Sequence, residues 1–275
     1  MFGVSGPRFS PGLGGGKSFG FCAGAAGLAP GAGTGIGRSL ALQFAEAGHQ
    51  VLITGRNSSN LVSVAHHFPD AITAFSWDVT DDGSCAVMGE VIDQHLGGLD
   101  IAILNAGHCE YVEQGKVTGD LFRRVYDVNV FGMVNSITVA LPRLKQSAAL
   151  SGRNGHIVGI ASLSAVIGFP RAEAYGSSKA AVNYLLESLR LDLSNESIDV
   201  TVVNPGFVET PMIGNNDFPM PFLMSSDKAA KKIITGIDAR KLKVQFPKRL
   251  YIILSLAALF PSLWYRANRK VLEKK

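Results

Sequence analysis

The stretch GAGTGIGRSL, from Gly31 to Leu40, has the form of a phosphate-binding turn that runs into a helix. Glycines in such a turn let the backbone approach a pyrophosphate, and the N-terminus of the helix then points at the anion. A glycine cluster alone is a weak signal, so its interpretation depends on the rest of the chain. The candidate cofactor contacts in this turn are Gly31, Gly33, Gly35, Ile36 and Gly37.

The residues before the turn do not have the character of the buried strand that a βαβ unit places there. FCAGAAGLAP, residues 21–30, consists of small residues, glycines and a proline, which are poor strand formers. We therefore expect residues 1–27 to be disordered or a misread segment, for example a shifted reading frame that rejoins the true one near Gly31. A secretory signal is the less favoured interpretation, because the segment is weakly apolar and adjoins the turn.

After the turn, short apolar strands alternate with helical segments. Strands rich in Val and Ile, separated by helices, indicate a parallel sheet covered on both faces. We expect one α/β domain over residues 28–247, with a doubly wound parallel sheet of the Rossmann type in three layers. The expected strands are residues 49–55, 71–79, 99–107, 155–162, 198–206 and 243–247, and the expected helices are 35–48, 58–67, 81–96, 118–146 and 172–194.

Four polar residues downstream of the turn form a chemically coherent set. Tyr175 and Lys179 are four residues apart, hence on one face of a helix. A phenol has a pKa of about 10, and a nearby ammonium group lowers it, so such a tyrosine can exchange a proton with a carbonyl or alcohol oxygen. Ser162 ends an apolar strand, where open α/β sheets bind ligands. Asn129 lies in the preceding helix, where its amide would hold a water that relays protons through Lys179.

Together with further motifs, this set resembles the short-chain dehydrogenase/reductase superfamily over Gly31 to Met212. The further motifs are Asp78-Val79, Leu104-Asn105-Ala106-Gly107 and Asn204-Pro205-Gly206. The resemblance implies a single Rossmann-type domain with a seven-stranded parallel sheet. It also implies reversible hydride transfer between a nicotinamide cofactor and a carbonyl or alcohol carbon.

The resemblance also assigns roles to positions of this chain. The catalytic residues would be Asn129, Ser162, Tyr175 and Lys179, with Tyr175 as the acid/base. Lys179 would also hold the nicotinamide ribose. The remaining cofactor contacts would be Asp78 and Val79 at the adenine end, Asn105, Ala106 and Gly107 in the cleft, and Pro205, Gly206, Val208 and Thr210 around the nicotinamide.

The residue after the second expected strand bears on which cofactor is used. The strand VLITG ends at Gly55, which carries no carboxylate for the ribose hydroxyls of NAD, and Arg56 follows it. A guanidinium group suits the 2′-phosphate of NADP. We expect a preference for NADP(H) over NAD(H), and the alternative is that Arg56 is a solvated loop charge.

The carboxyl-terminal part of the chain is apolar and basic. Residues 239–275 carry ten Lys or Arg and one acidic residue. Residues 250–260 form an apolar run too short to span a bilayer. We expect residues 248–275 to be an extension that rests on a membrane surface, with Trp264 and Tyr265 at the interface. Packing against the domain or a second subunit is the alternative. The apolar residues 218–224 are expected to form a lid over the substrate.

We therefore expect an NADP(H)-dependent oxidoreductase acting on a small apolar carbonyl or secondary alcohol, such as a ketone, steroid or lipid. The rival hypothesis is a catalytically silent protein of this fold whose poor first strand impairs the cofactor site. We expect a homodimer or homotetramer in the cytoplasm, with peripheral membrane contact. Three cysteines without a C-x-x-C pair favour a reducing compartment, and neither a metal site nor nucleic-acid binding is expected.

Overall fold

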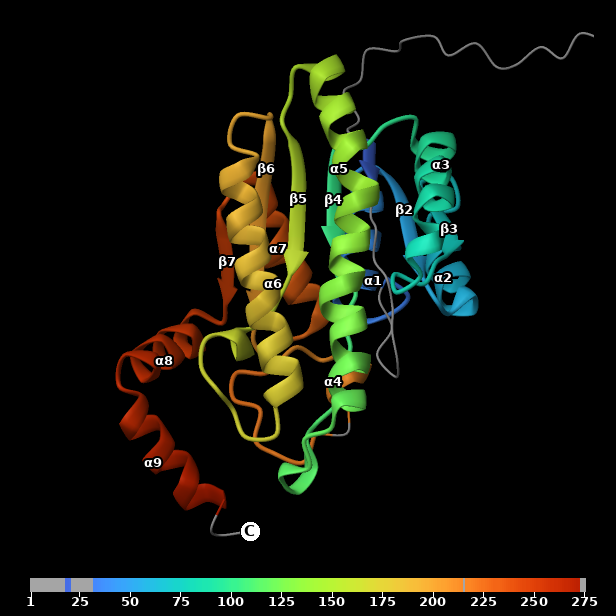
Figure 1. Ribbon diagram of the computed structural model, residues 1–275. Helices are drawn as coiled ribbons and strands as arrows, with labels where there is room; N and C mark the ends of the chain where they lie inside the picture. Colours follow the sequence, from blue (N-terminus) through green and yellow to red (C-terminus); the bar gives the residue numbers. More distant parts are fainter. Residues whose placement is uncertain (1–17, 21–31, 215, 273–275) are drawn as a thin grey trace, which may run out of the picture.

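The computed structural model describes residues 18–20, 32–214 and 216–272 (Figure 1). Seven parallel strands form one sheet in the order β3-β2-β1-β4-β5-β6-β7. The strands are β1 (Ser18–Gly20), β2 (Gln50–Gly55), β3 (Ile72–Ser76), β4 (Ile101–Leu104), β5 (Gly155–Ile160), β6 (Ile198–Pro205) and β7 (Lys243–Phe246). The helices are α1 (Gly35–Glu46), α2 (Ser58–Ala65), α3 (Cys85–Leu96), α4 (Gly119–Tyr126), α5 (Gly132–Ser151), α6 (Glu173–Asp192), α7 (Ser226–Asp238), α8 (Lys248–Leu259) and α9 (Pro261–Leu272).

Helices cover both faces of this sheet, which confirms the expected doubly wound α/β fold. The first layer contains α1, α2 and α7, and the second contains α3, α4, α5 and α6 (Figure 1). Each layer encloses its own apolar core against the sheet. Every residue of β4 and β5 is buried, as expected for parallel strands that are covered on both faces, and His156 is the polar residue among them.

The central strand β1 corrects the expectation that no strand precedes the glycine turn. Ser18 pairs with Gln50, and Gly20 pairs with both Leu52 and Ala102, so β1 lies between β2 and β4. The first strand thus lies before residue 28, the expected start of the domain. The facing edges of β2 and β4 are buried, and their backbone groups need hydrogen-bond partners. A strand that supplies these partners is favoured there even when its residues have weak strand propensity. The stretch 21–30 and Gly31 lie outside the described residues.

The long helix expected over residues 118–146 is divided in two. A π-helical turn, Asp127–Phe131, separates α4 from α5. Asn129 lies in this turn and is fully buried. The extra residue of such a turn redirects side chains, and π turns are frequent at functional sites.

A buried histidine in β5 leads to a prediction about stability. His156 is hydrogen-bonded through Nε2 to Oγ1 of Thr201, and burial lowers its pKa from 6.5 to about 4. The unfolded chain therefore takes up a proton as the pH falls below 6.5, whereas the folded chain does not until about 4. We expect the free energy of unfolding to fall by up to about 3 kcal/mol over this range.

Urea unfolding at several pH values tests this prediction. His156→Gln keeps a polar partner for Thr201 without a titrating group, so it should remove this part of the pH dependence. Identical pH dependence in the two proteins would show that His156 does not cause it.

Candidate active site

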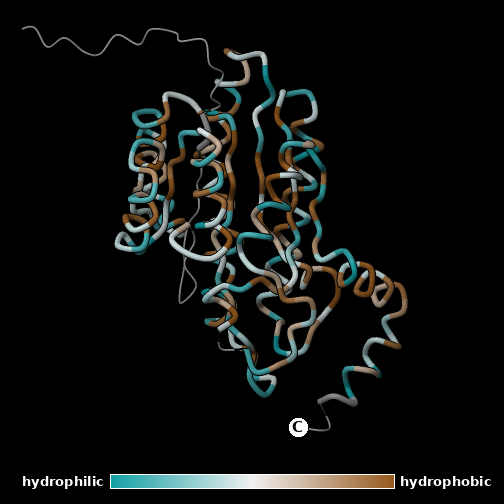
Figure 2. Tube along the Cα trace, turned by 180° about the vertical axis from the view of Figure 1, so that it is seen from behind, coloured by the Kyte–Doolittle hydropathy of each residue, from teal (hydrophilic) through white to brown (hydrophobic). Residues whose placement is uncertain are grey.

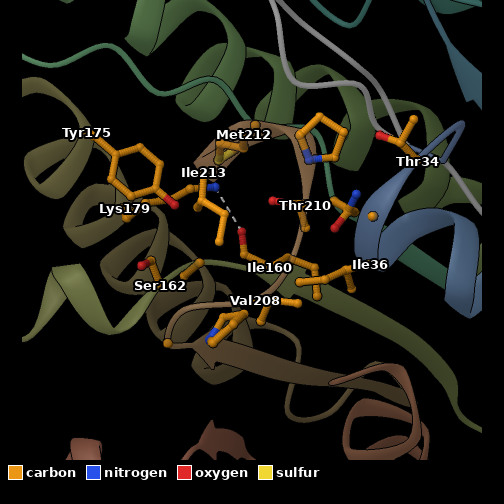
Figure 3. Close-up of a pocket in the computed structure, with 17 residues that line it drawn as sticks. Thr34, Ile36, Ile160, Ser162, Tyr175, Lys179, Val208, Thr210, Met212 and Ile213 are labelled. Atoms are coloured by element: carbon orange, nitrogen blue, oxygen red, sulfur yellow. Dashed lines mark hydrogen bonds between the residues drawn. The ribbon is translucent and has the colours of Figure 1, made fainter. Parts of the chain in front are cut away.

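The carboxyl ends of β4, β5 and β6 meet α6 and the start of α1 around one cleft (Figure 3). Tyr175, Lys179 and Ser162 lie at one end of this cleft, and Thr34 and Ile36 lie at the other. Thr210 and Met212, from the segment after β6, border it between these ends. Strands that run parallel end at the same edge of the sheet, so residues far apart in the sequence converge here.

Tyr175 and Lys179 lie one turn apart in α6, as the spacing predicts. The Nζ atom of Lys179 lies 5.9 Å from the centre of the Tyr175 ring. It donates a hydrogen bond of 3.0 Å to the carbonyl oxygen of Ile160 at the end of β5. Burial lowers the pKa of Lys179 to about 8. The ammonium group is thus fixed beside the phenol and loses its proton more readily than in water.

The ionisation of Tyr175 differs from the sequence-based expectation. Burial raises the pKa of this phenol above its ordinary value, and the nearby Cys109 thiol acts in the same direction. A hydrogen bond with Ser162 acts in the opposite direction. The expected lowering by Lys179 is not what the structure shows, because desolvation is the largest influence on this pKa and it favours the neutral phenol. Tyr175 is therefore protonated at neutral pH.

Ser162 and Asn129 are positioned by defined hydrogen bonds. Ser162 follows β5, and its hydroxyl oxygen accepts a hydrogen bond from the backbone N–H of Ser164 at 3.1 Å. The amide of Asn129 donates to the carbonyl oxygen of His108 at 2.9 Å and to Oγ of Ser178 at 2.8 Å. Both of its N–H groups are thus used by protein atoms. The side chain joins the segment after β4 to α6, and its expected role in proton relay stays a prediction.

The glycine turn and the segment after β6 approach each other across the cleft. Gly35 has a φ of +57°, and a Cβ on it would lie 2.8 Å from Cγ2 of Thr210. Only glycine meets both conditions. Because α1 begins at Gly35 in the cleft wall, its first N–H groups lie at this end of the cleft. Such a backbone-lined end beside a helix N-terminus fits the pyrophosphate of a dinucleotide.

Arg56 and Asp78 lie at the carboxyl ends of two neighbouring strands, β2 and β3. A nitrogen of Arg56 is 3.9 Å from a carboxylate oxygen of Asp78, and both side chains are partly exposed. Asp78 also accepts hydrogen bonds from the backbone and hydroxyl of Thr80. The Arg56 guanidinium is thus held near the adenine end that the resemblance assigns to Asp78.

The cleft brings together most of the residues that the sequence singled out. Gly31 lies outside the described residues. The predicted residues that line the cleft are Gly35, Ile36, Asn105, Gly107, Ser162, Tyr175, Lys179, Pro205, Gly206, Val208 and Thr210. Those described but not lining it are Gly33, Gly37, Arg56, Asp78, Val79, Ala106 and Asn129.

Other lining residues escaped sequence reasoning. Thr34 lies within the glycine turn, and Ile160 and Ala161 precede Ser162. Their positions next to predicted site residues in the sequence could have identified them as lining residues. Pro211, Met212 and Ile213 directly follow Thr210 and also line the cleft.

Aromatic residues from separate segments gather beside the catalytic groups. Phe218 packs edge-on against Tyr111, with ring centres 5.7 Å apart, and lies 6.1 Å from Phe207. The hydroxyl of Tyr111 donates to Oδ1 of Asn216 at 2.7 Å. Cys109 is mostly buried, and burial raises the pKa of its thiol to about 11, so it remains neutral. Tyr111, Phe207, Phe218 and the neutral Cys109 thiol thus form an apolar cluster, of which Tyr111 and Cys109 influence the pKa of Tyr175.

Arg171 contacts Tyr111 and two acidic residues near this aromatic cluster. Its guanidinium lies over the ring of Tyr111, 5.1 Å from the centre, and forms ion pairs with Glu113 and Asp217. Of the five residues expected to form a lid, Phe218 is packed in this way, whereas Phe222 and Leu223 are more than two-fifths exposed. The part of the expected lid at Phe218 is thus tied to the segment after β4.

Comparison with known proteins identifies the class to which this fold and site belong. The family model of short chain dehydrogenases matches residues 28–218. The chain is a member of the short-chain dehydrogenase/reductase family, and it is an oxidoreductase of that family. Members of this family generally use NAD(P)(H) and act on small molecules.

Two relatives and one solved structure illustrate the similarity. An uncharacterized oxidoreductase of Myxococcus xanthus is 32% identical over 238 residues, covering 86% of this chain and 92% of the relative. An uncharacterized oxidoreductase of Staphylococcus epidermidis is 30% identical over 189 residues, covering 68% and 80%. A short-chain dehydrogenase from Streptomyces avermitilis shares the fold, with a TM-score of 0.76, 22% identity and coverage of 94% and 97%.

Proposed function

We propose that this protein reduces an apolar ketone or aldehyde with NADPH, or runs the reverse reaction on the corresponding alcohol. The observation that carries the proposal is a partly buried tyrosine with a raised pKa, and therefore protonated at neutral pH, beside the buried Lys179 and Ser162 in one cleft. A neutral phenol is the form that can protonate an oxygen at which negative charge develops. When bound, the nicotinamide cofactor would supply the hydride.

The chain's own residues account for the remaining steps. The hydroxyl of Ser162 would hold the substrate oxygen, and Tyr175 would donate its proton to that oxygen. The ammonium group of Lys179 would stabilise the phenolate that remains. The glycine turn, Asn105 and Gly107, and the segment Pro205–Thr210 would hold the cofactor along the cleft.

The proposed substrate class rests on residues beside the lining of this cleft. Tyr111, Phe207 and Phe218 form an aromatic cluster, Tyr111 and Cys109 are close enough to Tyr175 to influence its pKa, and the Cys109 thiol is neutral. Such a cluster favours an apolar group next to the carbonyl, since it supplies few hydrogen-bond partners. The test is NADPH binding followed by fluorescence, and then a panel of ketones and aldehydes graded by chain length. Binding of NADPH without turnover of any panel member would favour the catalytically silent rival.

Arg56 gives a separate test of cofactor preference. We expect Arg56→Ala to raise KM for NADPH by about tenfold, because a charge-assisted contact to the 2′-phosphate is lost, and to leave KM for NADH nearly unchanged. Arg38→Ala is a matched control, since Arg38 is also a basic residue near the turn but hydrogen-bonds to His67. An unchanged ratio of the two KM values in Arg56→Ala would remove Arg56 from the cofactor site.

We also propose two assemblies for the protein. The first is a homodimer or homotetramer, supported by exposed apolar side chains on α5 and α6, namely Leu150, Tyr184 and Leu191. The second is peripheral membrane contact through the carboxyl-terminal helices, with the remainder of the protein in the cytoplasm. The free thiols of Cys85 and Cys109 are consistent with a reducing compartment.

A further inference from the structure

The last two helices are fixed to the domain beside the catalytic segment. Leu250 and Leu254 of α8 are buried against Leu163, which directly follows Ser162, and against Phe207. In α9, the indole N–H of Trp264 donates a hydrogen bond of 2.8 Å to the carbonyl oxygen of Gly168. Trp264 therefore belongs to the domain contact, which corrects the expectation that it lies at a membrane interface.

The opposite side of these helices is apolar and uncovered. The exposed apolar residues of α8 recur at helical spacing on one face, and Phe260 at the end of α8 and Leu263 in α9 are exposed as well. Figure 2 shows the apolar colouring of α8 at the lower right of the molecule. We call this surface the α8–α9 apolar face, and its exposed side chains are Ile252 (55%), Ile253 (50%), Leu256 (53%), Leu259 (70%), Phe260 (59%) and Leu263 (63%).

The charges around this face have one sign. Lys248 and Arg249 precede it and Arg266 follows it, and all three are exposed. The sequence 248–272 contains no acidic residue. An isologous contact between two copies would bring these cations together, whereas an anionic lipid surface would pair with them and would accept the apolar side chains. The charge pattern therefore favours lipid over a second copy.

We propose that the α8–α9 apolar face docks on an anionic phospholipid surface, with the apolar side chains between the headgroups. Among the described residues, no single helix is long and apolar enough to span a membrane. Lys248–Leu259 and Pro261–Arg269 satisfy length and composition only as a pair, and they are bent by 107° relative to each other. The bend and the contact of α8 with the domain suit a helix that lies along the surface.

The docked face would place the substrate cleft next to the lipid. α8 and α9 lie at the end of the sheet where the strands terminate (Figure 1). A Cβ on Gly206 would lie 3.0 Å from Cδ2 of Leu250, so α8 backs the cleft wall directly. Phe207 packs with α8 and lies near Phe218, which contacts Tyr111. Packed apolar side chains thus connect the docked helix with the neighbourhood of the site, which suits a carbonyl substrate that partitions into lipid, a consequence that rests on the proposed function.

The experiment is co-sedimentation of the full chain with phosphatidylcholine vesicles, with and without phosphatidylglycerol. We expect binding to the vesicles that contain phosphatidylglycerol, and weaker binding as salt rises. Ile253→Glu/Leu256→Glu should reduce partitioning by tenfold or more, on the order of the transfer energy of two half-buried aliphatic side chains. Arg249→Gln/Arg266→Gln should reduce it by about fivefold per charge. Val87→Glu, an equally exposed aliphatic position on α3, is the control and should bind as wild type.

The outcomes separate docking from catalysis. Reduction of a water-soluble ketone should be the same in all variants without vesicles, which also shows that they fold. Wild type that stays in solution with every vesicle overturns the docking proposal and leaves the proposed activity standing. Vesicle binding without ketone reduction would support the docking proposal and contradict the proposed activity. A smaller oligomer for Ile253→Glu/Leu256→Glu in analytical ultracentrifugation, without vesicle binding, would assign the face to a second copy and also overturn the proposal.

Discussion

Replacing Tyr175 by Phe should lower kcat for carbonyl reduction by a factor of about 10²–10⁴. The substitution removes one oxygen atom, which is the proposed proton donor, and keeps the ring. The phenol is protonated at neutral pH because its pKa is raised, and it lies in the cleft with a hydrogen bond to Ser162. Because the ring remains, KM for NADPH and the melting temperature should change little. Steady-state kinetics with a ketone from the panel measures kcat and KM, and thermal unfolding measures the melting temperature.

Tyr111→Phe is the matched control for this substitution. Tyr111 borders the same site, but its hydroxyl donates to Asn216 and its ring lies under Arg171. Loss of that hydrogen bond should affect the packing of the segment around Phe218 and change kcat by no more than a few-fold. Both variants lose one phenol hydroxyl. A large fall in kcat in Tyr175→Phe with a small change in kcat in Tyr111→Phe would therefore identify Tyr175 as the proton donor.

This comparison also separates the enzyme from its rival. A silent protein of this fold would show no turnover that either substitution could reduce. If Tyr175→Phe retained more than about a tenth of the wild-type kcat, the proton would have to come from elsewhere, and the role proposed for Tyr175 would be wrong.

The convergence of the candidate site residues was predictable because it depends on topology. Ser162 follows one buried strand, and Asn105 and Gly107 follow another. Once the apolar runs indicate a parallel sheet, their carboxyl ends must share an edge. The four-residue spacing of Tyr175 and Lys179 likewise requires only a helix. Both expectations follow from the regular geometry of strands and helices, which the pattern of residues in the sequence indicates directly.

The state of the tyrosine was not predictable in the same way. Spacing shows that Lys179 is close to Tyr175 but not how much water either group loses. In the structure Lys179 is buried and Tyr175 is partly buried, and desolvation favours the neutral form of each group. The charge of Lys179 alone predicts a lowered pKa for the phenol, whereas desolvation raises it.

The aromatic cluster and the strand β1 show a second limit. Tyr111, Phe207 and Phe218 come from three segments whose contacts depend on loop conformation, and no periodicity records that. β1 has the opposite character, because its residues give little local signal and its position between β2 and β4 is imposed by the neighbouring strands. For the aromatic cluster and for β1, tertiary contacts decide the structure more than local sequence preference does.

Lys179→Met should lower kcat/KM for NADPH by a factor of about 10²–10³, comparable to the loss of one charge-stabilising donor in other enzymes. Methionine keeps much of the length and apolar volume of lysine in a position that is 3% exposed. It lacks the cation that would stabilise the Tyr175 phenolate and the donor to the carbonyl oxygen of Ile160. The variant's fold can be checked by circular dichroism and its melting temperature.

The pH profile assigns this effect to the charge. The pKa of Lys179 is about 8, so the protonated fraction falls above that pH, and wild-type kcat/KM for NADPH should fall about tenfold per pH unit there. The Cys109 thiol has a pKa of about 11, and that of Tyr175 is raised above its ordinary value, so neither should titrate near pH 8. Lys179→Met should therefore lose the fall near pH 8, and Lys179→Arg should keep more activity without it. If the fall persists in Lys179→Met, another group titrates there, and the proposed role of the Lys179 ammonium is refuted.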